Sequence, residues 1–332
     1  MDPLIANRYN DDILLEVMLR YGIGNGAIRP LDAFESFIYE FQRGPQAYIL
    51  RISHSLRRSE ALIQGEVDWI NYLAEGGVSV ARAVLSENGN LVEPVEDGQG
   101  GSFLATAFVK AQGRPPWEAW TPALYEAYGS LLGSMHARAQ GYHPSRPEWK
   151  RPEWDDDLME FVERYLPASE AVAKARYQSL RDHVYTLPKG PSSYGLIHQD
   201  AHGSNLFVNE AGELTLFDFD ECAYSWFAND IAIALFYIVM EAGDWPSFTA
   251  EFMSHFLRGY RGANRLDPEW LKEMPVFLKM REIEMYAVIH RDFDVNHIDD
   301  DWCERFMRER KIKIEQDIPY IDFDFESLAA YL

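Results

Sequence analysis

The segment His198-Gln-Asp-Ala-His-Gly-Ser-Asn205 is followed, one short turn later, by Leu216-Phe-Asp-Phe-Asp-Glu221. In these segments Asp200 and Asn205 are five residues apart, and Asp218 follows a short apolar run. An Asp, an Asn and a second Asp in this order are typical of a loop and a strand end that gather oxygen atoms around a hydroxyl group and a divalent cation. A lone HxD would equally fit a polar turn. The complete pattern favours the metal site.

The three side chains have separate predicted roles. Asp200 is suited to orient a substrate hydroxyl and to accept its proton. Asn205 offers a neutral oxygen and Asp218 a charged one to Mg²⁺, which needs only one or two carboxylates besides nucleotide phosphates. The sequence therefore predicts phosphoryl transfer from a nucleotide to a hydroxyl, with Asp200 as the catalytic base.

The composition indicates a large, acidic, folded chain. With 332 residues, 47% of them hydrophobic, it is too long for one small domain, and two lobes are expected. The longest apolar run, from Ile231 to Met240, is too short for a bilayer, and the first residues lack a signal-peptide profile. We therefore expect a cytoplasmic protein without a membrane partner. The formal net charge of −22 disfavours nucleic acid as a partner and would favour a cationic one, although solubility alone also explains the charge.

The first 109 residues are predicted to form a small antiparallel lobe with one main helix. Strands are predicted at 37–41, 48–52, 80–85, 91–95 and 103–109. The turn residues Gly44-Pro45 and Asn88-Gly89-Asn90 predict that the first four strands form two hairpins. Apolar periodicity predicts an opening helix at 11–21 and the main helix at 59–75.

Residues 110–332 are predicted to form a larger, mostly helical lobe. Helices are predicted at 122–140, 154–165, 168–185, 230–241, 246–260, 268–290 and 302–315. Short strands are predicted only beside the motif, at 195–197, 206–208 and 214–217. The fold class is therefore α+β, and we expect a nucleotide to bind between the two lobes.

The motif residues, together with Phe217-Asp-Phe-Asp220 and Asn229-Asp230, resemble the aminoglycoside phosphotransferase and choline kinase family of protein-kinase-like small-molecule kinases. His202 separates this loop from that of eukaryotic protein kinases. The resemblance implies a bilobal protein-kinase-like fold, ATP or GTP as the donor, Mg²⁺ as the cofactor and transfer to a small-molecule hydroxyl. It also implies Asp220 as an additional metal ligand.

The nucleotide-binding residues of the first lobe follow the kinase pattern less closely. Protein kinases use a Gly-rich loop, a strand lysine and a helix glutamate. Here residues 31–37 contain no glycine, and Ser36 is the candidate hydroxyl donor to phosphate. Arg51 stands where the lysine is expected, with Glu66 as its predicted partner. Backbone groups from Phe108 to Lys110 are expected to bind the base.

Each of these assignments has a structural alternative. Ser36 fits an ordinary strand connection, Arg51 a surface strand position, and Glu66 a solvated helix position. We expect His198 and His202 to support the catalytic loop by hydrogen bonds. Asp230 is expected to cap the apolar helix that it opens, and a tether to the catalytic loop is its second interpretation.

The acceptor is less well specified. Acidic and aromatic residues at 290–294 and 299–302 favour a cationic amine of aminoglycoside, choline or homoserine type, although a solvated helix entry also explains them. A protein Ser/Thr kinase of the same fold is the second hypothesis, but no Ala-Pro-Glu segment follows Asp218. A non-catalytic nucleotide-binding module is the third, and the presence of all three motif residues disfavours it.

Overall fold

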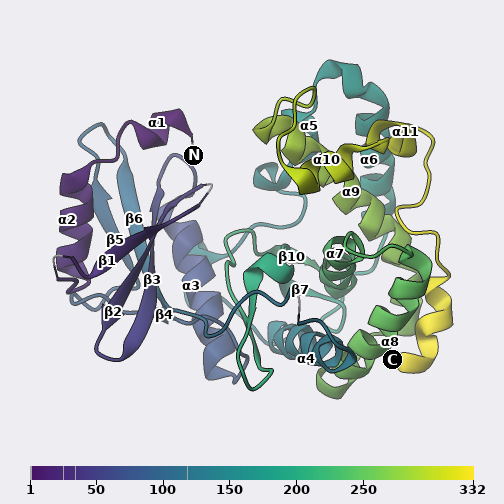
Figure 1. Cartoon of the computed structure of the whole chain (residues 1–332), viewed down its shortest axis with the longest axis horizontal. Helices are drawn as coiled ribbons and strands as arrows, with labels where there is room; N and C mark the ends of the chain where they lie inside the picture. Colours follow the sequence, from purple (N-terminus) through teal and green to yellow (C-terminus); the bar gives the residue numbers. More distant parts are fainter. Residues whose placement is uncertain (1, 25, 34, 118) are drawn as a thin grey trace.

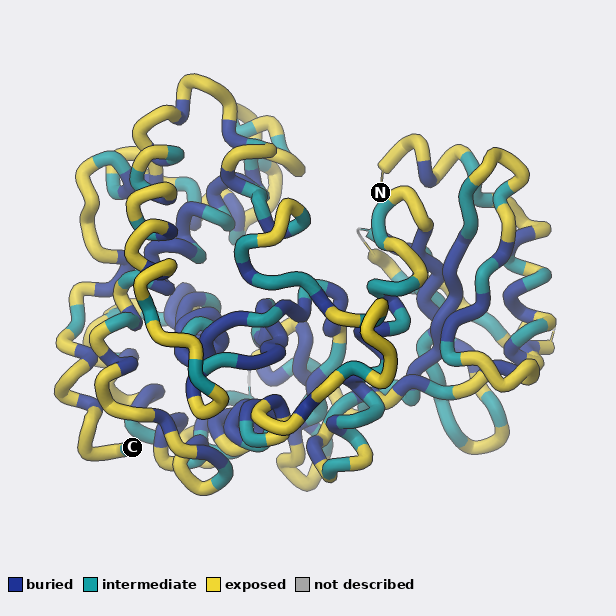
Figure 2. Tube along the Cα trace, turned by 180° about the vertical axis from the view of Figure 1, so that it is seen from behind, coloured by how far each residue is buried: buried dark blue, intermediate teal, exposed yellow. Residues whose placement is uncertain are grey.

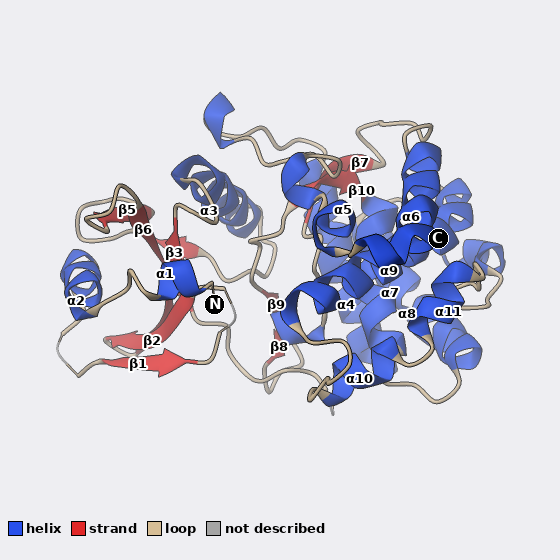
Figure 3. Cartoon of the chain, turned by 90° about the horizontal axis from the view of Figure 1, so that it is seen from above, coloured by secondary structure: helices blue, strands red, loops and turns tan. Residues whose placement is uncertain are grey.

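The computed structural model describes residues 2–24, 26–33, 35–117 and 119–332, which form two lobes (Figure 1). The N-terminal lobe holds a sheet with flanking helices, and the larger second lobe is mainly helical (Figure 3). The α+β class predicted from the sequence is confirmed. Buried residues run through the interior of both lobes, while loops and outer helix turns are exposed (Figure 2). We keep the 109/110 boundary as a proposal.

The sheet of the N-terminal lobe is antiparallel. Its strands are β1 (Ile28–Leu31), β2 (Phe37–Arg43), β3 (Gln46–His54), β4 (Ala83–Val84), β5 (Val92–Glu96) and β6 (Ser102–Val109). They lie in the order β1-β2-β3-β6-β4, and β5 also pairs with β6. The predicted hairpin of β2 and β3 is present, with Gly44 at a φ of +62° in its turn.

The predicted second hairpin is wrong. β4 and β5 each pair with β6 instead of with each other. The turn between them is held from within, because Ser86, Asn88 and Asn90 side chains all donate to the buried carboxylate of Glu93. The polar residues that indicated a tight turn therefore close a broad loop around one carboxylate.

Three helices flank this sheet: α1 (Pro3–Ala6), α2 (Asp11–Arg20) and α3 (Glu60–Glu75). The helices predicted at 11–21 and 59–75 are present as α2 and α3. Leu50 and Ile52 of β3 pack in the same hydrophobic cluster as residues of α2. Arg51 lies between them and contacts α3 instead. Since successive side chains of a strand point to opposite faces, this alternation aims one charged residue of an apolar strand at α3.

The helices of the larger lobe are α4 (Pro122–Ala139), α5 (Phe161–Tyr165), α6 (Ala171–Val184), α7 (Phe227–Val239), α8 (Trp245–Ala263), α9 (Met274–Asp292), α10 (Asp301–Met307) and α11 (Arg310–Glu315). Short 3₁₀ helices lie at Pro147–Trp149, Asp157–Met159, Ala168–Glu170, Gly203–Asn205, Pro268–Glu273 and Phe325–Tyr331. Thr121 caps α4, and Pro122 occupies its first turn, where an N–H is not needed. Among the described residues, none of the helices combines the length and apolar character required to cross a membrane.

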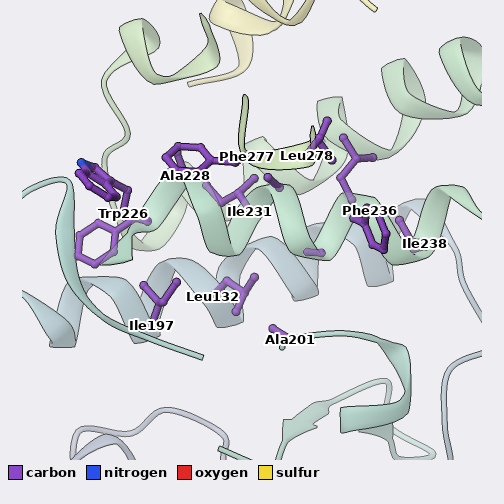
Figure 4. Packing of buried hydrophobic residues seen from close by; sticks show 14 of the residues in the cluster. Leu132, Ile197, Ala201, Trp226, Ala228, Ile231, Phe236, Ile238, Phe277 and Leu278 are labelled. Carbon is purple, nitrogen blue, oxygen red and sulfur yellow. The ribbon is translucent and has the colours of Figure 1, made fainter. Parts of the chain in front are cut away.

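Helix α7 is the centre of the larger hydrophobic cluster. Ile231 and Phe236 of α7 are fully buried. The helix lies between α4, which contributes Leu132, and α9, which contributes Phe277 and Leu278 (Figure 4). A helix that is apolar on nearly every side suits such a central position. The packing fixes α4, α7 and α9 relative to the loop that carries the motif.

Two short two-stranded sheets lie in the larger lobe. β8 (Leu206–Val208) pairs with β9 (Leu214–Leu216) as the pattern predicted, and β7 (Tyr194–Ile197) pairs with β10 (Ala223–Trp226). The strand β10 was not predicted, because its four residues carry no alternating pattern.

Two predicted helices differ from the structure. In the stretch 154–165 only α5 is an α-helix, and Trp154 instead donates its backbone N–H to the carbonyl of Tyr224 in β10. The stretch 302–315 is divided into α10 and α11, since Glu309 takes a left-handed φ of +58°. Both differences arise from local backbone contacts that apolar periodicity does not record.

Candidate active site

The catalytic loop follows β7 and is anchored by Asp230. The carboxylate of Asp230 accepts the backbone N–H groups of His198 and Gln199 at 3.1 and 3.0 Å, and His136 Nε2 lies 3.1 Å from it. Helix α7 begins at Phe227, so the predicted capping role of Asp230 is wrong. The alternative, a tether to the loop, describes its contacts. Because Asp230 is fully buried, these donors are what compensate for its lost hydration.

His198 supports the loop from inside. Its Nε2 donates to the Phe217 carbonyl at 3.0 Å, and its Nδ1 accepts the N–H of Asp200 at 3.2 Å. Burial lowers the pKa of His198, although Asp230 and Asp200 act in the opposite direction. A neutral ring with one donor and one acceptor nitrogen matches both bonds. His198 thus joins the loop to the segment that carries Asp218.

The carboxylate of Asp200 is surrounded by donors. Its Oδ1 accepts from Arg281 Nη2 at 2.5 Å and from Tyr237 Oη at 3.2 Å. Its Oδ2 lies 3.2 Å from His202 Nε2 and 3.3 Å from Asn205 Nδ2. Burial acts to raise the pKa of Asp200, but His202 and Arg281 outweigh it and hold the pKa well below its usual range. These donors therefore keep Asp200 ionised at neutral pH.

Asp218 lies in a different environment. It takes a left-handed φ of +62°, which costs a non-glycine residue roughly 1–2 kcal/mol, and 56% of its side chain is exposed. Burial of its surroundings raises the pKa of Asp218 to about 7, Arg51 opposes this, and the nearby carboxylates of Asp220 and Glu66 add to it. The left-handed backbone thus presents a partly exposed carboxylate that faces Arg51 and lies near other acidic groups.

Asn205 completes the predicted metal set. It is buried, its carbonyl accepts the N–H of Phe217 at 3.0 Å, and its Nδ2 also donates to the backbone carbonyl of Asp200 at 3.0 Å. This leaves the amide oxygen of Asn205 free of those bonds. Amide and carboxylate oxygens are the ligand types that fit a hard divalent cation such as Mg²⁺.

The structure brings Arg51 and Glu66 together as a buried ion pair. The guanidinium donates to both carboxylate oxygens of Glu66 at 2.9 and 2.6 Å. It also lies 5.1 Å from the ring centre of Phe108 and 3.9 Å from Asp218 Oδ1. A two-pronged pair of this kind holds a guanidinium in one orientation. Arg51 is thereby fixed within reach of the carboxylate we assign to the metal.

Other residues predicted to bind the nucleotide are engaged within the N-terminal lobe. Ser36 Oγ is buried 3.0 Å from Ser53 Oγ, and Phe34 of the same loop lies outside the described residues. Lys110 Nζ is 2.9 Å from Glu40, and the N–H of Lys110 donates to the carbonyl of Ala47. Both side chains have partners within the lobe, and phosphate and base contacts for them stay a prediction.

Asp220 contacts arginines in the structure. Arg57 Nη2 donates to its Oδ2 at 2.5 Å, Arg58 Nη2 lies 3.4 Å from the same oxygen, and Arg151 Nη2 donates to its carbonyl at 2.6 Å. Burial acts to raise the pKa of Asp220, yet the arginines lower it below its usual range. Arg57 and Arg58 come from the connection between β3 and α3, so these contacts tie the two lobes together. A metal role for Asp220 stays a prediction.

The acidic residues near the end of α9 make local contacts. Asp300 caps α10 through the N–H of Cys303 at 2.8 Å, and Asp294 accepts the N–H of Asn296 at 3.0 Å. The solvated helix entry therefore accounts for these two acids. Arg281 and Tyr237, by contrast, touch Asp200 directly and were not predicted. They stand in helices α9 and α7, where no motif marks them.

Comparisons with known proteins identify the family of the chain. A family model described as the phosphotransferase enzyme family matches residues 27–274. The chain is 39% identical over 325 residues to an amicoumacin kinase of Bacillus subtilis (strain 168), an alignment that covers 96% of each protein. It is 36% identical to the solved structure of amicoumacin kinase hAmiN in complex with AMP-PNP, Ca²⁺ and Ami, with a TM-score of 0.93 and coverage of 99% of this chain and 100% of that one.

More distant structures share the fold. A microcompartment-associated aminopropanol kinase has a TM-score of 0.74 at 22% identity, covering 92% of this chain and 97% of that one. A spectinomycin phosphotransferase has a TM-score of 0.60 at 16% identity, covering 98% and 99%. The predicted bilobal, protein-kinase-like fold is confirmed by these neighbours. The chain therefore belongs to the phosphotransferase enzyme family, and it is a kinase that acts on a small molecule.

Proposed function

We propose that this kinase transfers the terminal phosphate of ATP to a hydroxyl group of amicoumacin or of a chemically similar small molecule. The observation that carries the proposal is the likeness to amicoumacin kinases, at 39% identity over 96% of the chain and a TM-score of 0.93. The ATP analogue and the divalent cation in that neighbouring structure support ATP and Mg²⁺ for this chain. A cytoplasmic location, as expected from the sequence, belongs to the same proposal.

Asp200 and Arg51 have separate roles in the proposed transfer. Asp200 orients the acceptor hydroxyl and takes up its proton while the oxygen bonds to the γ-phosphorus, and the bond from that phosphorus to the bridging oxygen of ATP breaks to release ADP. Its depressed pKa makes it a weak base, so the proton moves late, which suits a loose transition state. Arg51, held by Glu66, binds phosphate oxygens through its fork of N–H groups.

Asn205 and Asp218 are the residues that would hold Mg²⁺. When bound, the ion neutralises charge on the phosphates. The raised pKa of Asp218 and the open amide oxygen of Asn205 support this assignment. The fixed loop supplies the rest of the effect, because positioning and electrostatics dominate catalysis of phosphoryl transfer.

The base of the nucleotide is proposed to be read where the two lobes join. The N–H groups of Val109 and Lys110 already donate to the carbonyls of Arg82 and Ala47. Their own carbonyl groups and the residues that follow are therefore the backbone groups we propose for this contact. Comparing turnover with ATP and with GTP tests the preference for ATP.

An amine-bearing acceptor of aminoglycoside, choline or homoserine type is the second candidate. The fold shared with aminopropanol kinase and spectinomycin phosphotransferase is compatible with it, but identities of 22% and 16% carry the fold alone. The amicoumacin-type acceptor therefore ranks first.

The test is a substrate panel with purified protein. ADP release and the mass of the acceptor are followed with amicoumacin, aminoglycosides, choline, homoserine and simple amino alcohols in the presence of ATP and Mg²⁺. We expect amicoumacin to gain one phosphate with the highest kcat/KM, and Asp200→Asn to abolish the signal. A higher kcat/KM for another acceptor would replace amicoumacin in the proposal, and phosphate on added protein alone would support a protein kinase.

A further inference from the structure

A line of alternating charges runs from Asp200 into the helical lobe. Arg281 Nη2 donates to Asp200 Oδ1 at 2.5 Å, and Arg281 Nη1 lies 3.7 Å from Glu284 Oε2. Tyr177 Oη in turn donates to Glu284 Oε1 at 2.7 Å. The four residues come from the catalytic loop, α9 and α6. These contacts are therefore tertiary, and they connect the carboxylate of Asp200 to side chains of two helices.

We propose that Arg281 is a positioning residue that fixes the Asp200 carboxylate for the acceptor hydroxyl, with Glu284 and Tyr177 holding the guanidinium from behind. The inference rests on the proposed function, since it assigns Asp200 the role given above. Arg281 acts through Asp200 and not on the nucleotide.

The burial of these groups supports a fixed geometry. The side chains of Arg281 and Glu284 are 12% and 13% exposed, and Tyr177 is buried. A buried cation is costly unless carboxylates and hydrogen bonds surround it. Arg281 has both, because it lies between Asp200 and Glu284 and also donates to Tyr237 Oη at 2.7 Å. A guanidinium with these partners has little freedom to rotate.

The occupancy of the Asp200 carboxylate shows where the acceptor enters. A carboxylate offers about four acceptor positions, and here Oδ1 meets Arg281 and Tyr237 while Oδ2 meets His202 and Asn205. An arriving hydroxyl must replace one donor. On Oδ1 the contact of Tyr237 is the longer and uncharged one, and the Tyr237 oxygen keeps Arg281 as a donor after it leaves. The acceptor therefore takes the position of Tyr237, and Arg281 stays in place.

The size of the effect follows from the cost of misplacement. Without Arg281 the carboxylate can turn away from Oδ1's present position, and a shift of about 1 Å at a reacting group costs about 100-fold in rate. We expect Arg281→Met to lower kcat about 100-fold and to leave the Kd for ATP unchanged. Arg281→Lys keeps one charged donor and should recover about ten-fold of that loss.

The decisive experiment is a double-mutant cycle on radiolabelled phosphate transfer in single turnover. Arg281→Met, Asp200→Asn and the double variant are compared with the wild type, and the Kd for ATP is measured for each. If Arg281 acts through Asp200, its removal changes the rate of the Asp200→Asn protein by less than about three-fold. Equal fold losses in both backgrounds would overturn the inference.

A matched control separates positioning from general stability. Arg310 is likewise a buried arginine, and it donates to Glu282 at 2.6 Å and to the carbonyl of Phe306, away from Asp200, Glu284 and Tyr177. Arg310→Met should lower the Tm and leave kcat near the wild-type value. An equal loss of kcat in this variant would contradict the inference.

Failure of the inference and failure of the proposed function give different results. A wild-type protein that phosphorylates its acceptor, together with an Arg281→Met protein of equal kcat, overturns only the inference. A wild-type protein no faster than Asp200→Asn overturns the proposed function. Should Arg281→Met not fold, Arg281→Lys carries the cycle, and wild-type kcat with this variant counts against the inference.

Discussion

The loop that carries Asp200 and the segment that carries Asp218 present the same carboxyl group in opposite environments. Asp200 is surrounded by donors and cations, and its pKa lies well below the usual range. Asp218 has carboxylates around it, keeps half of its side chain exposed, and has a pKa of about 7. Pairs of titratable groups whose pKa values are driven apart mark different chemical roles. Arginine and histidine side chains of the protein surround Asp200, whereas Asp218 is the carboxylate that we propose to hold the cation.

The largest expected effect on kcat is that of replacing Asp200. Asp200→Asn removes the charge that orients the hydroxyl and accepts its proton, and we expect kcat to fall by about 10³- to 10⁴-fold. The Kd for ATP should be retained, because the residue faces the acceptor. ADP release and equilibrium nucleotide binding measure the two effects. A loss confined to ATP binding would show that Asp200 serves the nucleotide and not the acceptor hydroxyl.

The next largest effect is expected for Asp218, the carboxylate that we assign to the metal. Asp218→Asn should lower kcat by about 10²- to 10³-fold at low Mg²⁺ and shift the Mg²⁺ concentration required for half-maximal rate upward, because the charged ligand is lost. Titrations of rate against Mg²⁺ provide the measurement.

Asp220→Asn compares the second predicted metal carboxylate with Asp218. Because Arg57 and Arg58 already contact Asp220, we expect a lower Tm and a smaller shift in the Mg²⁺ requirement than for Asp218→Asn. An upward shift as large as that of Asp218→Asn would assign Asp220 to the metal as well.

A smaller effect is expected at the ion pair beside Asp218. Glu66→Gln leaves Arg51 without its buried partner, which typically costs about 3–5 kcal/mol of stability. We expect a lower Tm and a rise in the KM for ATP of about ten-fold, because Arg51 is no longer held toward the phosphates. Glu282→Gln breaks a comparable buried pair with Arg310 at 2.6 Å and should lower the Tm alone. Identical KM values for ATP in the Glu66→Gln and Glu282→Gln proteins would show that Arg51 does not bind the nucleotide.

The smallest effect is expected at Tyr237. Tyr237→Phe removes the donor that we propose the acceptor hydroxyl replaces, and it leaves the bond between Arg281 and Asp200 intact. Since one hydrogen bond contributes about 1 kcal/mol, kcat should stay within about five-fold of the wild type. Steady-state kinetics with varied acceptor provide the measurement. A loss of about 100-fold or more would make Tyr237 itself part of the catalytic machinery.

The sequence predicted the parts of the site that are local. Asp200, Asn205 and Asp218 lie within one loop and one hairpin, so their short separation in the sequence predicts that they lie close together in space. The same holds for the hairpin of β2 and β3, which needs only its turn at Gly44. Short-range patterns determine such features because few chain conformations bring neighbouring residues together differently.

The parts that depend on distant contacts were not predictable. Arg281 and Tyr237 reach Asp200 across 81 and 37 residues, from helices whose apolar pattern records only which side is buried. β4 and β5 likewise pair with β6 because of the whole sheet, not because of the turn between them. Asp230 was expected at a helix start, yet its burial beneath the loop makes it an anchor.

The most direct test of this division between the two carboxylates is thermal unfolding with ATP, with and without Mg²⁺, for the wild type, Asp200→Asn and Asp218→Asn. A ligand that binds only the folded state raises the Tm in proportion to its binding free energy. We predict that Mg²⁺ adds to the ATP-induced rise in Tm for the wild type and for Asp200→Asn, and adds little for Asp218→Asn. A Mg²⁺ effect that is lost in Asp200→Asn and kept in Asp218→Asn would contradict the account.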